Sequence, residues 1–138
     1  MNSELKEIIK KVEKDFPFPD YIQYATYAAE NLVKTIKNYL PRGSSILDFG
    51  SGPCDKTAII QSYGYNCSAY DDLGDEWHRK ENNLNEIVNF TKKYNINFTL
   101  ADKKEMPYKK HSFDMVMAND VLEHLHNSPL PYQNYVFY

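Results

Sequence analysis

The chain has 138 residues, 42% of them hydrophobic and 25% charged, which is the length and composition of one globular domain with its own core. Its net charge of −3 gives no basic footprint, so nucleic acid and anionic membranes are disfavoured as partners. The sequence contains no membrane-spanning apolar run, no secretory leader, and only two cysteines without disulfide or zinc spacing. We therefore expect a cytoplasmic protein without a bound metal.

The first 40 residues predict two helices. Apolar residues recur at helical spacing in both, and Asp20 with Gln23 has the form of a capping box at the start of the second. From Ser45 onward short apolar strands alternate with helices. The patterns predict helices over residues 3–15, 20–40, 54–63 and 80–93 and from Asp120 on, and strands over residues 45–49, 66–70, 96–101 and 113–118.

This alternation predicts an α/β fold in which an open, doubly wound, mostly parallel sheet follows N-terminal helices. Parallel strands need crossover connections, and helices supply them. Ligands of such sheets bind at the carboxyl ends of the strands. The polar residues that directly follow each strand are therefore the candidates for a functional site.

The segment SSILDFGSGPCDKT places Asp48 near the end of the first strand and Gly50 and Gly52 in the turn that follows. Glycines there allow a tight turn and let a ligand approach the backbone. A dinucleotide fingerprint requires a third glycine where Asp55 stands, and the charge of Asp48 opposes a pyrophosphate. The pattern therefore favours a ligand that carries an ammonium or sulfonium group over NAD. A turn without a ligand is the alternative.

Asp71 ends the second predicted strand, 19 residues after Gly52. A carboxylate at about this distance accepts hydrogen bonds from the two hydroxyl groups of a ribose. The alternative is an ordinary solvated acid, because the DDLGDE segment contains four. Asp102 follows the third strand and could accept a hydrogen bond from an exocyclic amine such as that of adenine, or cap the next turn.

Taken in order, ILDFGSGPCDKT, SAYDD and FTLADKKEMPYKKHSFDMVMANDVLEHL resemble the motifs of class I S-adenosylmethionine-dependent methyltransferases. The resemblance covers roughly residues 44–126. It implies a Rossmann-like fold, S-adenosylmethionine as the cofactor, and transfer of a methyl group. It also implies a single domain with an N-terminal helical segment (1–43), a cofactor-binding core (44–126) and a short tail (127–138).

The resemblance assigns the first motif to the methionine portion of the cofactor. Gly50, Ser51 and Gly52 pass close to it, and Asp48 holds the turn or the amino group. Many members have a further glycine where this chain has Cys54, so the loop is expected to be tighter here.

The remaining cofactor contacts are implied for the residues that follow the later strands. Asp71 takes the ribose hydroxyls, and Asp102 with the backbone of Lys103 flanks the adenine. Asn119 and Asp120 line the side that carries the methyl group.

A hydroxyl acceptor needs a general base, and Glu123 and His124 are the nearest candidates. The alternative is that Val121, Leu122 and Leu125 form a packed helix face while the two polar residues are solvated or cap the helix. The acceptor is expected to be a small molecule or a glycan.

The family's sheet normally has three further strands, whereas this sequence stops at Tyr138. We therefore expect a truncated methyltransferase or a cofactor-binding fragment of one. A non-catalytic S-adenosylmethionine-binding module is the alternative, and an NAD-dependent oxidoreductase is a weaker one. The apolar run Met115–Ala118 predicts a strand buried on both faces that becomes a sheet edge here, so we expect a homo-oligomer that shields this edge.

Overall fold

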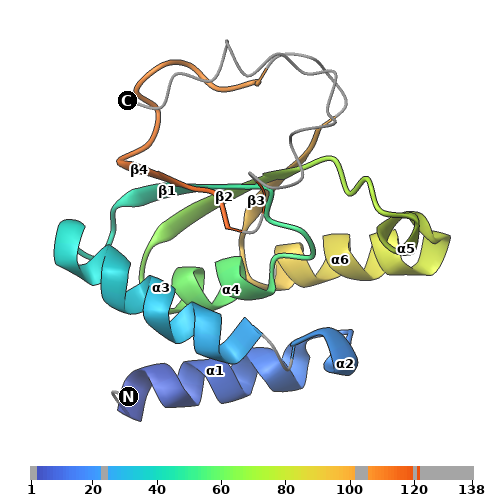
Figure 1. Ribbon diagram of the computed structural model, residues 1–138, viewed down its shortest axis with the longest axis horizontal. Coiled ribbons are helices and arrows are strands. Elements are labelled where there is room, and N and C mark those ends of the chain that lie inside the picture. Colours follow the sequence, from blue (N-terminus) through green and yellow to red (C-terminus); the bar gives the residue numbers. More distant parts are fainter. Residues whose placement is uncertain (1–2, 23–24, 102–105, 120, 122–138) are drawn as a thin grey trace.

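The computed structural model describes residues 3–22, 25–101, 106–119 and 121 (Figure 1). The described helices and strands are α1 (Ser3–Asp15), α2 (Pro19–Ile22), α3 (Ala25–Tyr39), β1 (Ser45–Phe49), α4 (Asp55–Ser62), β2 (Asn66–Asp71), α5 (Glu76–Arg79), α6 (Glu81–Lys93), β3 (Asn97–Leu100) and β4 (Met115–Met117). None of the helices in these ranges is long and apolar enough to cross a membrane.

The four strands form one parallel sheet in the order β3-β2-β1-β4. Figure 1 shows the helices on one face of this sheet, while residues 106–114 pass over the other face. The predicted α/β fold with a parallel sheet and N-terminal helices is confirmed. All four strands end at the same edge, so the residues that follow them are brought together there.

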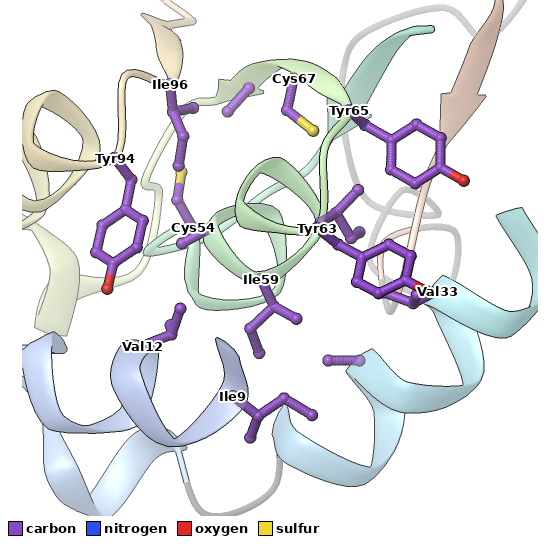
Figure 2. Packing of buried hydrophobic residues seen from close by; sticks show 14 of the residues in the cluster. Ile9, Val12, Val33, Cys54, Ile59, Tyr63, Tyr65, Cys67, Tyr94 and Ile96 are labelled. Atoms are coloured by element: carbon purple, nitrogen blue, oxygen red, sulfur yellow. The ribbon is translucent and has the colours of Figure 1, made fainter. Parts of the chain in front are cut away.

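The helix-covered face holds the larger of the two hydrophobic cores. It joins buried residues of α1, α3 and α4 to the sheet, and Figure 2 shows Ile9, Val12, Val33 and Ile59 converging there. Ion pairs fix α1 from both ends, because Arg42 binds Glu4 at 2.6 Å and Lys93 binds Asp15 at 2.8 Å. The N-terminal helices are therefore part of the same packed unit as the sheet.

A smaller cluster lies on the opposite face. Its buried residues are Leu47, Phe49 and Tyr70. The partly buried side chains that pack against them are Ala101, Met106, Tyr108, Phe113, Val116, Ala118 and Val121. Alternate residues of β1 serve the two faces, since Ile46 belongs to the larger core and Leu47 to this cluster. By the same alternation, Asp48 points toward the helices.

Several boundaries differ from the predictions. Asp20 lies inside α2, which begins at Pro19, so the predicted capping box is wrong; proline suits a first helical position because its missing N–H has no partner there. The helix predicted over residues 20–40 is described as α2 and α3, and the loop after β2 contains the short helix α5. Strand β4 is shorter than predicted, and only Met117 in it is buried, whereas Met115 and Val116 are partly exposed. The helix predicted from Asp120 lies outside the described residues apart from Val121.

Candidate functional site

The candidate site lies at the carboxyl ends of β1, β2 and β4. The glycine loop, residues 50–54, connects β1 to the N-terminus of α4. Asp71 ends the neighbouring strand β2, and Asn119 follows β4 on the other side of β1. The sheet therefore brings together three of the segments in which the sequence predicts site residues.

Asp48 is buried beneath the loop, with 3% of its surface exposed. Its Oδ2 accepts a hydrogen bond of 2.5 Å from the Thr57 hydroxyl in α4. Burial raises the pKa of Asp48 to about 7, although the Thr57 hydrogen bond acts in the opposite direction. In this structure the carboxyl group thus links β1 to α4 and holds the turn between them.

Gly50 and Gly52 both have left-handed backbone conformations, with φ of 73° and 53°. A Cβ atom at Gly50 would lie 2.2 Å from Val121, so the chain itself fills the space over this glycine. Among the described residues, a Cβ atom at Gly52 would meet only the Tyr21 hydroxyl, at 3.5 Å. Both glycines are required by the turn, and the bare surface of Gly52 faces the N-terminal segment.

The two side chains that cover the glycines, Val121 and Tyr21, were not individually predicted as site residues, although the Tyr-rich segment from Asp20 to Tyr39 was considered as a cover for the open side of the site. Val121 stands in the family-like DVLEHL segment, where it was expected in a packed helix face, and Tyr21 belongs to no such motif. Their positions depend on how distant segments pack over the loop, so no local signal could have identified them.

Asp71 binds the glycine loop directly. Its Oδ2 accepts a hydrogen bond of 2.7 Å from the Gly52 N–H, and its Oδ1 accepts one of 2.6 Å from the Leu73 N–H. Burial raises the pKa of this carboxyl group, while the two N–H donors act to lower it. Each carboxylate oxygen has a further lone pair, so Asp71 can still accept hydrogen bonds from the two hydroxyl groups of a diol.

Cys54 ends the loop with φ of 66°, the left-handed region that glycine adopts most readily. This is the position at which the resemblance implies a further glycine. The thiol is fully buried, with its sulfur 3.4 Å from the Ser51 hydroxyl and 3.7 Å from the Gly52 carbonyl oxygen. The loop therefore keeps a glycine-like backbone and gains a buried side chain beneath it.

A cavity of about 260 Å³ lies beside the loop, between α3, the start of α4 and the end of β4. Its lining combines small apolar and polar side chains: Ala28, Asn31, Leu32, Thr35, Lys56 and Asn119. The Nδ2 atom of Asn119 is buried and has no hydrogen-bond partner within the described chain. A ligand with an oxygen acceptor would satisfy this donor.

Five further residues that the sequence singles out lie outside the described residues. They are Asp102, Lys103, Asp120, Glu123 and His124. Of the predicted cofactor contacts, the structure describes Asp48, Gly50, Ser51, Gly52, Asp71 and Asn119.

Comparison with known proteins gives a family match over most of the chain. Residues 21–131 match the methyltransferase domain family. None of the curated proteins matches the chain.

Solved structures with the same fold include three from different organisms. A candidate RNA methyltransferase of Pyrococcus horikoshii aligns with a TM-score of 0.57 and 14% identity, covering 86% of this chain and 59% of its own. A candidate S-adenosyl-L-methionine-dependent methyltransferase of Methanococcus maripaludis aligns with a TM-score of 0.53 and 19% identity, covering 86% of this chain and 50% of its own. The YcgJ protein of Bacillus subtilis aligns with a TM-score of 0.51 and 16% identity, covering 67% of this chain and 37% of its own. The chain thus spans between about a third and three fifths of these structures.

Proposed function

The chain belongs to the methyltransferase domain family, and we propose that it binds S-adenosylmethionine at the glycine loop and Asp71 and transfers the methyl group to a small-molecule or glycan acceptor. The bound cofactor would supply a methyl group on a sulfonium centre. Alignment of that methyl group with the acceptor accounts for most of the rate gain expected in such a reaction.

The observation that carries the cofactor proposal is the contact between Asp71 and the glycine loop. The hydrogen bond from Gly52 places the carboxylate at the end of β2 against the turn that begins α4. A ribose at Asp71 and an amino acid portion along the loop would then be parts of one extended ligand. Asp48, Gly50 and Ser51 would support the loop backbone on which the ligand lies.

The cavity beside the loop supports a small polar acceptor. Its volume of about 260 Å³ is below the roughly 300–1,000 Å³ of typical ligand pockets, which suits a compact molecule or one sugar unit. Asn119 would orient an acceptor oxygen through its Nδ2, which has no hydrogen-bond partner among the described residues. The RNA substrate named for the Pyrococcus horikoshii protein is not extended to this chain, because its net charge of −3 does not favour binding to a polyanion.

The other predicted roles belong to the same proposal. Asp102 and the backbone of Lys103 would flank the adenine. Glu123 or His124 would act as the general base toward a hydroxyl acceptor. A non-catalytic module that binds the cofactor without turnover is the alternative, and a methyl-transfer assay with candidate acceptors separates the two.

Calorimetric titration with S-adenosylmethionine, S-adenosylhomocysteine and NAD tests the cofactor proposal. We expect the two sulfur compounds to bind and NAD to bind more weakly or not at all. Asp71→Ala should weaken binding by about 1.5–3 kcal/mol, the value of hydrogen bonds to a charged group. Asp72→Ala is the matched control, because Asp72 is exposed and bonds only the adjacent Gly74 N–H among the described contacts. Tighter NAD binding would overturn the proposal.

We also propose that the chain self-associates through β4. This strand is an edge of the described sheet, and edge strands with unpaired backbone groups favour association. Sedimentation velocity at micromolar concentration is the test. Val116→Lys, which places a charge on that strand, should shift a dimer toward the monomer, and a wild-type monomer would contradict the proposal.

A further inference from the structure

Aromatic side chains join the N-terminal segment to the loop after β2. Tyr21 of α2 stacks on Trp77 of α5, with ring centroids 5.6 Å apart and planes inclined by 10°. Phe18 meets the Trp77 ring edge-on at 4.7 Å, and Phe16 links Phe18 to Phe90 of α6. The inner members of this cluster are buried or half-buried, whereas Tyr21 is 43% exposed.

The exposed end of the cluster lies at the candidate cofactor site. The Tyr21 hydroxyl lies 3.5 Å from the position that a Cβ atom on Gly52 would occupy. The Gly52 N–H in turn donates to Asp71. Tyr21 therefore covers the bare glycine beside the carboxylate proposed to bind ribose, and Trp77 lies behind it six residues after Asp71 in the chain.

We propose that Tyr21, supported by Trp77, forms an aromatic subsite that contacts the adenosyl-sulfonium ligand where its ribose meets its methionine portion. This inference rests on the proposed function. A ligand that approaches Gly52 has to contact Tyr21 or displace it, since the hydroxyl stands over that glycine. Either event changes the surroundings of the stacked Trp77 ring.

The chain offers a direct probe, because Trp77 is its only tryptophan. We expect S-adenosylhomocysteine to change the Trp77 emission of the full chain along the same saturation curve that calorimetry gives. Trp77→Phe should bind the ligand and show no signal, which assigns the signal to this ring.

Substitutions separate a ligand contact from a purely structural role. Tyr21→Ala should weaken S-adenosylhomocysteine binding about three- to tenfold, as expected for the loss of one aromatic contact. Tyr21→Phe keeps the ring and should retain most of the affinity. Tyr39→Ala is the control, because Tyr39 is a 75% exposed tyrosine near the end of α3. Melting temperatures confirm that each variant is folded.

Failure of the aromatic subsite and failure of the proposed function give different experimental results. Calorimetric binding with unchanged Trp77 emission, or with the affinity of Tyr21→Ala equal to that of the wild type, would overturn the aromatic subsite and leave the proposed function intact. Absence of calorimetric binding by the wild-type chain would overturn the proposed function and this inference together.

Discussion

The two faces of the sheet are covered in different ways. On one face, α1, α3, α4 and α6 pack into a continuous core, and side chains such as Ile59 lose all contact with water. On the other, three buried residues are covered mainly by residues 106–114, most of which are exposed to solvent. The glycine loop lies between these regions. Its shape is fixed from the helix side through Asp48 and Thr57, and it contacts the thinly covered side through Val121.

The part of the candidate site proposed to bind the cofactor is built into the stable core, whereas the region around Asn119 is not. Asp48 and Thr57 are buried, and Asp71 is held by two backbone donors. Asn119 is partly exposed, and one of its polar atoms lacks a described partner. Substitutions on the two faces should therefore lower the free energy of unfolding by different amounts.

The largest effect is expected for the helix-covered core. Ile59→Ala should lower the free energy of unfolding by about 2–5 kcal/mol, because a fully buried side chain leaves a cavity among packed neighbours. Val116→Ala, on half-exposed β4, should cost only about 1 kcal/mol. Urea unfolding measures both. Equal losses would show that the two faces are equally well packed and would contradict the comparison.

The next effect tests the contact between the loop and the thinly covered face. Gly50→Ala should lower the free energy of unfolding by about 2–4 kcal/mol, because the left-handed backbone is strained by a side chain and the new Cβ meets Val121. Gly52→Ala shares the backbone strain but makes only an ordinary contact, so about 1–2 kcal/mol is expected.

A double substitution isolates the steric part of the Gly50 effect. Gly50→Ala combined with Val121→Ala should recover part of the lost stability, since the smaller side chain makes room for the new Cβ. If the double variant is no more stable than expected from the two single ones, Val121 does not press on the loop.

The sequence predicted the fold and part of the site because these depend on local patterns. Alternating strands and helices indicated the parallel sheet, and the polar residues that follow the strands were expected to be the candidates for the site at its edge. The hydrogen bond from the Gly52 N–H to Asp71 was not itself predicted, but it joins two of these candidate residues across neighbouring strands. What could not be predicted depends on packing between distant segments, such as Tyr21 over Gly52 and Val121 over Gly50. The helix boundary at Pro19 was missed because the Asp20–Gln23 pattern imitates a cap.

The pH dependence of stability tests the buried carboxyl group on the helix side. An aspartate in an unfolded chain titrates at about pH 4, whereas burial raises the pKa of Asp48 to about 7. Between these values the folded chain holds a proton that the unfolded chain has released. The contribution of this group to stability therefore falls as the pH rises through this window. Above about pH 7 the folded chain bears the full free-energy penalty of a buried, ionised carboxylate.

Asp48→Asn removes that charge and keeps an oxygen that can accept from Thr57. It should raise the free energy of unfolding by about 1–3 kcal/mol at pH 8 and have little effect at pH 4, measured by urea unfolding. Asp55 and Asp71 also have raised pKa values and contribute to the pH dependence of both proteins. The test is therefore the difference in the free energy of unfolding between the variant and the wild type at each pH. A stabilisation that is the same at both pH values would show that Asp48 does not titrate in this window.

The smallest effect concerns Cys54, where the loop keeps a left-handed backbone with a non-glycine residue. Cys54→Gly relieves the backbone strain, but it loses a fully buried thiol and gives the unfolded chain more freedom, so the net change in stability should be close to zero. Cys54→Ala loses most of the same packing and keeps the strain. The informative quantity is therefore the difference between the two variants, and Gly should be more stable than Ala by about 1 kcal/mol. Urea unfolding of the pair measures it. A more stable alanine variant would mean that the backbone at residue 54 does not adopt the left-handed conformation in solution, and the loop would then approach Asp71 differently.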